Sequence, residues 1–152
     1  MKHIRISLFL FLCLFLSGCC PIGKNCEPAN SQVYAGDISI TLLASQSWYP
    51  SNSVIKLKLS IQNHSQKTID LQRLDGPVVD IVYSSDPTQR WSAQPDLAVD
   101  IHTLTLQPGE TYSIEWEFLA TRDDVYGFYG MLWIWEQESR TGLTVLVGNV
   151  DH

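Results

Sequence analysis

The chain has 152 residues, of which 45% are hydrophobic and 17% charged, and its formal net charge is −6 at pH 7. This length suits a single domain with a sizeable core. An acidic chain without a cluster of Lys or Arg argues against binding to nucleic acid and against electrostatic docking on anionic lipid.

The first residues have the features of an export signal. Lys2 and Arg5 make a positive start, and residues 6–16 form an almost wholly apolar stretch. A helix that spans a bilayer needs about 20 apolar residues, so this shorter stretch is interpreted as a removable signal segment. The sequence Leu16-Ser17-Gly18-Cys19 that follows resembles the lipobox of bacterial lipoproteins.

The lipobox resemblance implies that the sulfur of Cys19 takes a diacylglyceryl group and that a peptidase cuts before this residue. The alternative is an ordinary signal peptide with a chance cysteine. Removal of residues 1–18 leaves 134 residues and changes the net charge from −6 to −8, because Lys2 and Arg5 are lost. We therefore expect lipid, not surface charge, to hold the domain at the cell membrane, or at the outer membrane if the organism has one.

The remaining cysteines fall in a segment that is typical of a tether. Residues 19–32 carry Pro, Gly, Asn and Ser without periodicity. Cys13 lies in the signal and Cys19 takes the lipid, so Cys20 and Cys26 are the thiols left in an oxidising location. They can form a disulfide with each other, stay unpaired or pair with another molecule. A zinc site is less well supported, because no further cysteine or nearby histidine completes four ligands.

From residue 33 to residue 152 the pattern predicts one β-sandwich domain. Apolar and polar residues alternate with the period of a half-buried strand, and Gly, Pro, Asn and Asp separate the segments. Seven or eight antiparallel strands of this kind favour an all-β, Ig-like sandwich, with a jelly roll or a barrel as alternatives. The segments are residues 38–43, 55–62, 69–71, 79–83, 99–106, 112–118, 126–135 and 143–150.

Within residues 57–133 the order of features resembles the intracellular proteinase inhibitor (BsuPI) family. The features are an Asn-containing turn at the end of a strand, a Gly-containing bend into a strand with Asp, an Arg-Trp-Ser segment and a Leu-x-Pro-Gly-Glu turn. The resemblance implies an Ig-like fold and proteinase inhibition. Two departures are the export signal and the segment 85–89, which replaces the family's acidic-Gly hairpin. The matching segments are residues 59–65, 76–83, 90–92 and 106–111.

Nothing in the sequence indicates catalysis, a cofactor or a metal site. The histidines outside the signal, His64, His102 and His152, are far apart, and no known catalytic motif is present. Glu115 and Glu117 have a spacing compatible with a glycosidase pair, but the same spacing is typical of a solvated strand face, which we favour. We therefore predict that the protein is not an enzyme.

Aromatic residues in the segment 126–135 are the main candidates for binding. Trp133 and Trp135 are expected on one strand face, with Leu132 and Ile134 on the other. Either this strand is covered on both sides, which we favour, or one face is exposed and binds a sugar or a protein.

Three loop residues add to these candidates. Trp91 lies beside Arg90, and both Arg90 and Arg122 are expected in loops, where either could enter a trypsin-like protease cleft. The alternative, which we favour, is that these arginines are simply exposed.

These features lead to three hypotheses of function. The first is a membrane-anchored lipoprotein with a non-catalytic Ig-like interaction domain that binds a protein or glycan of the cell envelope. The second is an exported proteinase inhibitor of the BsuPI type, and the third is a carbohydrate-binding module.

Overall fold

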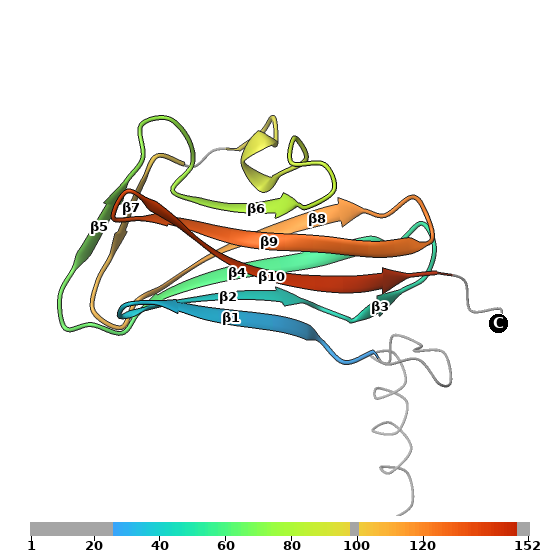
Figure 1. Ribbon diagram of the computed structural model, residues 1–152, viewed down its shortest axis with the longest axis horizontal. Coiled ribbons are helices and arrows are strands. Elements are labelled where there is room, and N and C mark those ends of the chain that lie inside the picture. The colour runs from blue at the N-terminus through green and yellow to red at the C-terminus, as the bar shows by residue number, and fades with distance from the viewer. Residues whose placement is uncertain (1–25, 98–100, 149–152) are drawn as a thin grey trace, which may run out of the picture.

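The computed structural model describes residues 26–97 and 101–148. The signal segment, Cys19, Cys20 and His152 lie outside these ranges. The described residues form strands joined by short loops and one short 3-10 helix (Figure 1). The elements are β1 (Ala29–Ala35), β2 (Ile38–Ala44), β3 (Trp48–Tyr49), β4 (Val54–Asn63), β5 (Ile69–Gln72), β6 (Val79–Tyr83), η1 (Trp91–Ala93), β7 (Thr103–Leu106), β8 (Thr111–Leu119), β9 (Asp124–Ile134) and β10 (Gln137–Val147).

Two four-stranded sheets pack face to face, with strand orders β1-β2-β4-β8 and β3-β10-β9-β6. The orders β2-β4-β8 and β10-β9-β6 correspond to strands A-B-E and G-F-C of an immunoglobulin domain. All pairings are antiparallel except that of β3 with β10. The prediction of an all-β, Ig-like sandwich is therefore confirmed.

The core forms where the alternating residues of the two sheets meet. Along β4 and β8 every second residue is buried, as the sequence pattern predicted. Aromatic rings fill the β8 side of the core, where the rings of Phe118 and Phe128 lie 5.1 Å apart and those of Tyr83 and Phe118 lie 4.9 Å apart. Offset and edge-on ring pairs of this kind add about 0.5–1.5 kcal/mol each beyond the burial of their area.

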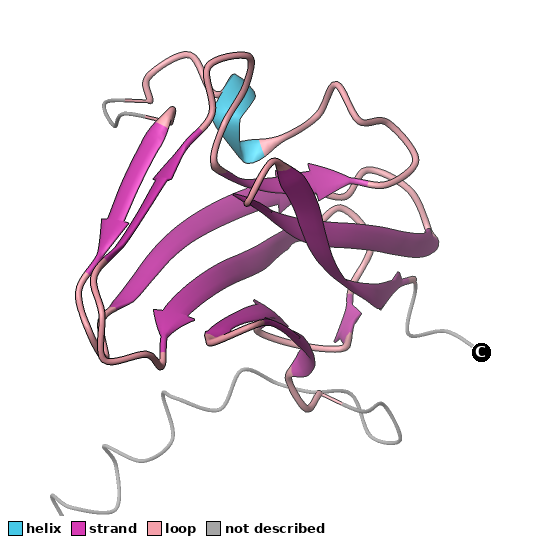
Figure 2. Cartoon of the chain, turned by 60° about the vertical axis from the view of Figure 1, so that its left-hand side comes forward, coloured by secondary structure: helices cyan, strands magenta, loops and turns pink. Residues whose placement is uncertain are grey.

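The third, two-stranded sheet of β5 and β7 lies across one end of the sandwich (Figures 1 and 2). Asn63, which is fully buried, fastens this sheet to β4. Its amide Nδ2 donates to the carbonyl oxygens of Lys67, Leu106 and Gln107, at 2.8, 3.1 and 3.2 Å. Its Oδ1 accepts hydrogen bonds from Ser65. The Asn-containing turn and the Leu-x-Pro-Gly-Glu turn of the sequence thus meet at one side chain.

Several predicted boundaries were wrong, among them that of the strand expected at 143–150, since β10 begins already at Gln137 and ends at Val147. The structure begins its first strand at Ala29, so β1 occupies the end of the segment 19–32 that we took for a tether. The half-buried side of β1 is made of small residues such as Ala29, Ser31 and Ala35, which give no apolar signal in the sequence. The strand expected at 99–106 is shorter, because β7 begins only at Thr103.

The sandwich has two distinct ends, which we name by their chain features. At the N-terminal end β1 begins, β3 lies beside the end of β10, and β8 turns into β9. At the turn end lie the β1–β2 and β9–β10 turns and the β5–β7 sheet (Figure 1).

Candidate binding surface

Trp135 lies in a tight turn, not in a strand as predicted. Ile134 pairs with Gln137, so Trp135 and Glu136 alone connect β9 to β10. Their φ angles are 50° and 61°, which is the left-handed region that a two-residue type I′ turn requires at both positions. Asn and Gly are the usual residues there, and other residues pay about 1–2 kcal/mol each for this conformation. Trp135 is therefore held in a costly conformation at an exposed tip.

The ring of Trp135 rests on the neighbouring β1–β2 turn. A Cβ atom at Gly36 would lie 2.9 Å from Cη2 of Trp135, and Gly36 itself has a φ of 58°. Glycine is thus required both by the backbone and by the ring above it. The contact covers only part of the indole, because Trp135 keeps 69% of its surface exposed.

Two other large apolar side chains are exposed at the same end. Tyr34 is 63% exposed on β1, two residues before Gly36, and its ring centroid lies 6.1 Å from that of His64. Leu74 is 85% exposed in the loop between β5 and β6. We call Tyr34, Leu74 and Trp135 the turn-end group. All three lie at the turn end, and exposed large apolar residues at one end of a domain are candidates for a binding surface.

Trp133 lies on the outer face of β9 and is half-buried beneath an arginine. Cζ of Arg73 lies 4.2 Å from the centroid of the Trp133 ring. Nε of Arg73 also donates to Asp75 at 3.0 Å, and this hydrogen bond lowers the pKa of the Asp75 carboxyl. A Cβ atom at Gly76 would lie 3.1 Å from the guanidinium, so the loop closes tightly around it. The prediction that Trp133 and Trp135 share one strand face was therefore wrong, because Trp135 lies in the turn. Trp133 is covered, as the favoured alternative predicted.

Tyr129, also on the outer face of β9, has a similar arginine cover. Cζ of Arg140 lies 4.6 Å from its ring centroid, and Arg140 donates a hydrogen bond to Glu138. Below this ring, Gly127 and Gly142 contribute no side chains, which leaves a shallow hollow of about 390 Å³ in the face of β9 and β10. Since Arg140 occupies one side of the Tyr129 ring, the hollow is not a bare aromatic platform.

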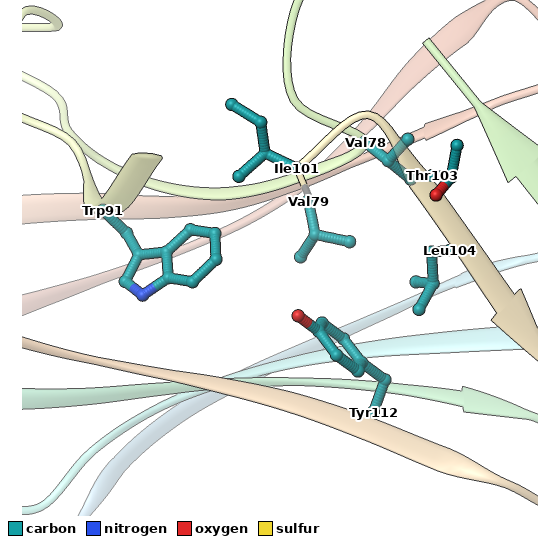
Figure 3. Close-up of a pocket in the computed structure, with 7 residues that line it drawn as sticks. All are labelled: Val78, Val79, Trp91, Ile101, Thr103, Leu104 and Tyr112. Carbon is teal, nitrogen blue, oxygen red and sulfur yellow. The ribbon is translucent and has the colours of Figure 1, made fainter. Parts of the chain in front are cut away.

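Trp91 lies in the core and is not exposed as a binding residue would be. It is only 7% exposed and belongs to the core cluster. The loop from β6 folds back and places the indole against a partly open cavity of about 180 Å³, in which the Tyr112 hydroxyl also points inward (Figure 3). Burial raises the pKa of the Tyr112 phenol. The lining is mostly apolar and comprises Val78, Val79, Trp91, Ile101, Thr103, Leu104 and Tyr112.

Arg90 is turned toward its own loop, which removes it as a residue presented to a protease. Its Nε and Nη2 donate to the Pro87 carbonyl at 2.8 and 2.6 Å, and Nη1 lies 3.8 Å from the Asp80 carboxylate. The fully buried Asp80 accepts hydrogen bonds from the backbone and side chain of Ser92, at 2.9 and 2.7 Å. Burial raises the pKa of Asp80, although these hydrogen bonds and Arg90 oppose the shift. The Arg-Trp-Ser segment therefore has a structural role.

Arg122 lies in the exposed loop between β8 and β9, as expected. Tyr126 fixes its backbone, because the Tyr126 hydroxyl donates to the Arg122 carbonyl and accepts from the Arg122 N–H, both at 3.2 Å. This arrangement is the tyrosine corner of Ig-like domains. The side chain of Arg122 is exposed.

The cysteine predictions fall mostly outside the described residues. Cys26 is disulfide-bonded, and its partner cysteine lies outside the described ranges, so the pairing with Cys20 stays a prediction. Cys19 and its lipidation also lie outside them. No helix among the described residues is long and apolar enough to cross a membrane.

The polar candidates of the sequence do not converge on a catalytic site. Glu115 and Glu117 form ion pairs with Lys58 and Lys56 on a solvated face, at 3.4 and 3.6 Å. Nε2 of His64 lies 2.9 Å from the Ser39 hydroxyl. Within residues 26–97 and 101–148, no group of three or more His, Cys, Asp or Glu side chains is placed to hold a metal ion.

No family model matches the chain, and no curated protein does. Neither comparison supports the resemblance to the BsuPI family or to lipobox lipoproteins, and both stay predictions.

Three solved structures with a similar course of the chain are distant in sequence. The CARDB domain of a Pyrococcus furiosus protein is 11% identical with a TM-score of 0.47, over 80% of this chain and 94% of that one. The sporulation control protein Spo0M of Bacillus subtilis is 12% identical with a TM-score of 0.49, over 75% of this chain and 50% of that one. A β-glucosidase of Listeria innocua is 13% identical with a TM-score of 0.40, over 71% of this chain and 16% of that one.

Proposed function

We propose that the chain is an exported lipoprotein, anchored through Cys19, whose Ig-like domain is a non-catalytic interaction module of the cell envelope. In this proposal the turn-end group is the binding surface. The observation that carries it is Trp135, a large aromatic residue that stays exposed in a backbone conformation unfavourable to it. Strain of this kind persists where it serves a function, because an unstrained Asn-Gly turn would connect the same strands.

The position of the turn-end group fits a tethered domain. The chain enters the sandwich at the opposite end, where the Ser47 N–H donates to the Glu27 carbonyl at 2.8 Å. β9 runs between the two ends with eleven residues, so they lie about 35 Å apart at roughly 3.3 Å per residue. A lipid on Cys19 would hold the N-terminal end near the bilayer and leave Trp135 directed away from it.

Site-specific photo-crosslinking in intact cells tests the binding surface. A photo-reactive amino acid at Leu74 is expected to give a discrete adduct with an envelope component. Trp135→Ala is expected to abolish this adduct while the domain stays folded, because Trp135 keeps 69% of its surface exposed. The matched control is Leu146→Ala at the N-terminal end, which should leave the adduct unchanged. An adduct that persists in Trp135→Ala contradicts the proposal.

Detergent phase partition tests the anchor separately. The full chain is expected to enter the detergent phase and to incorporate labelled palmitate, and Cys19→Ala is expected to do neither. Retention of Cys19→Ala in the detergent phase would contradict the lipid anchor. It would leave the proposal for the binding surface unchanged.

An exported proteinase inhibitor of the BsuPI type is the second candidate function. The observation in its favour is the exposed Arg122, whose backbone Tyr126 holds in one conformation. Inhibition of trypsin-like proteases at sub-micromolar concentration, lost in Arg122→Ala and kept in Arg90→Ala, would support it. Absence of inhibition across a panel of serine proteases would exclude it.

Carbohydrate binding is a narrower form of the first proposal, and the exposed indole of Trp135 favours it. It predicts a change of tryptophan fluorescence with soluble polysaccharide that is absent in Trp135→Ala. Trp133 is a less suitable platform, because Arg73 already covers its ring.

A further inference from the structure

The outer edge of β8 offers a second surface, separate from the turn-end group. β8 is the edge strand of its sheet and pairs only with β4 among the described strands. With nine residues it is also the longest edge strand of the described sandwich. The edge of β6 differs, because Val82 bridges to Arg90, the Tyr83 N–H donates to the Gln89 carbonyl and the Val78 N–H donates to the Ile101 carbonyl.

The register of β8 on β4 shows which backbone groups point outward. The Asn63 N–H donates to the Glu110 carbonyl and the Ala120 N–H donates to the Ser53 carbonyl, so the even-numbered residues of β8 are those hydrogen-bonded to β4. In an antiparallel pair the intervening residues direct their N–H and C=O groups to the other side. The outward residues are Thr111, Ser113, Glu115, Glu117 and Leu119.

The side chains along this edge select the kind of strand that can join it. On the solvent face, β4 carries Lys56 and Lys58, and β8 carries Glu117 and Glu115 opposite them. A second copy of β8 that aligns Glu115 with Glu117 would place like charges directly opposite each other, which is destabilising. An added strand with Lys or Arg opposite these glutamates continues the alternation of charge. Its inward residues would lie beside Ile114, Trp116 and Phe118, which favours apolar side chains there.

The cavity of Figure 3 lies at the Tyr112 end of the same strand. At about 180 Å³ it is of the size that accepts one ring or one branched aliphatic side chain, since an apolar cavity of about 150 Å³ holds benzene. It offers an apolar site for the inward side chain at that end of an added strand.

We propose that β8 binds an extended peptide segment of a partner by strand addition, and that the segment alternates basic with apolar residues. Main-chain hydrogen bonds provide affinity in this mode, and alternate side chains provide specificity. The turn-end group does not require a partner of this class. An experiment can therefore contradict the β8 proposal without contradicting the proposal for the turn-end group, and the reverse.

Amide hydrogen exchange with synthetic peptides tests strand addition on the folded domain. The probe is a nine-residue peptide alternating Lys with Val, and its control alternates Glu with Val. The Lys peptide is expected to slow exchange at the N–H groups of Glu115 and Glu117, and to leave those of Ile114 and Trp116 unchanged because they already bond to β4. Protection at β1 instead, or protection by both peptides alike, would overturn the proposal.

Two variants separate the backbone contribution from the charge contribution. Ser113→Pro removes one outward N–H without breaking a backbone bond to β4 and without changing the charge, and it should weaken binding of the Lys peptide about tenfold or more. The double variant Glu115→Lys with Glu117→Lys should lose the Lys peptide and gain the Glu peptide. Its matched control, Asp37→Lys with Asp96→Lys, makes the same change in net charge elsewhere and should leave the preference unchanged. If this control reverses the preference too, net charge and not the β8 edge explains the binding.

Discussion

The two ends of the sandwich differ in the kind of large hydrophobic residue that they expose. The exposed large hydrophobic residues at the N-terminal end are all aliphatic and are spread over both sheets: Val54, Leu119, Val125 and Leu146. Those at the turn end include both exposed aromatics, Tyr34 and Trp135, and the most exposed aliphatic residue, Leu74.

The residues with positive φ angles also differ between the two ends. Asn52 in the β3–β4 turn at the N-terminal end has a φ of 58°, a region that Asn enters readily. At the turn end the same region holds Trp135 and Glu136, which do not suit it. A local side-chain preference explains the first case and not the second. The turn end is therefore the place where the residue types and the local backbone conformation disagree.

The largest effect at the turn end is expected from the residue that fastens β5 and β7. Asn63→Ala would leave three carbonyl acceptors without their donor in a buried place, and we expect a loss of about 2–4 kcal/mol in the free energy of unfolding. Urea denaturation measures it. A loss below about 1 kcal/mol would mean that the β5–β7 sheet is held mainly by other contacts, and the turn end would then be less firmly built than we describe.

The corresponding test at the N-terminal end is Tyr126→Phe. It removes the hydroxyl that bonds both the N–H and the carbonyl of Arg122, with an expected loss of about 1–1.5 kcal/mol. The control is Tyr83→Phe, which removes a hydroxyl from the same aromatic cluster. Equal losses in both variants would argue against a special role for the tyrosine corner.

The strands with one wet face were predictable, and the residues that depend on other segments were not. β4 and β8 show their buried face directly as alternation, so their positions followed from the sequence. Trp91 carries no such signal, because its burial depends on a loop that folds back beside β6, where Val82 bridges to Arg90. Its place in the core could not be inferred from the neighbouring residues alone.

The sequence predicted only part of the candidate surface, because the register of β9 on β10 was not known. Trp135 was identified as a candidate, but its turn was not, since Trp-Glu lacks the Asn-Gly pattern that indicates a type I′ turn. Because the turn was not recognised, the register of β9 on β10 could not be predicted. The contact of Arg140 with Tyr129 depends on that register, so it could not be predicted either. Arg73 was missed because it approaches Trp133 from a different segment of the chain.

Relief of the strained turn provides a smaller test of the comparison. Glu136→Gly is expected to raise the free energy of unfolding by about 1 kcal/mol, because Gly adopts positive φ without the penalty of a side chain. Thermal unfolding measures the gain, and Asn52→Gly is the matched control at the other end, where a much smaller change is expected. A destabilised Glu136→Gly would show that the Glu136 side chain makes a contact that outweighs the strain.

The smallest effect concerns pH and the buried Asp80. Because burial raises the pKa of Asp80 above its unfolded value, the folded state favours the protonated form. The stabilisation from this group is complete below the unfolded pKa and is lost as pH rises through the raised folded pKa. Asp80→Asn has no such titration, so its free energy of unfolding relative to the original chain should rise with pH across that window and then level off. The pKa values of the surface residues Asp75 and Asp86 are lowered instead. Both residues are present in both proteins, so the difference between the two proteins isolates Asp80. A difference that is constant from acid to neutral pH would mean that the hydrogen bonds from Ser92 fully offset the burial of the charge.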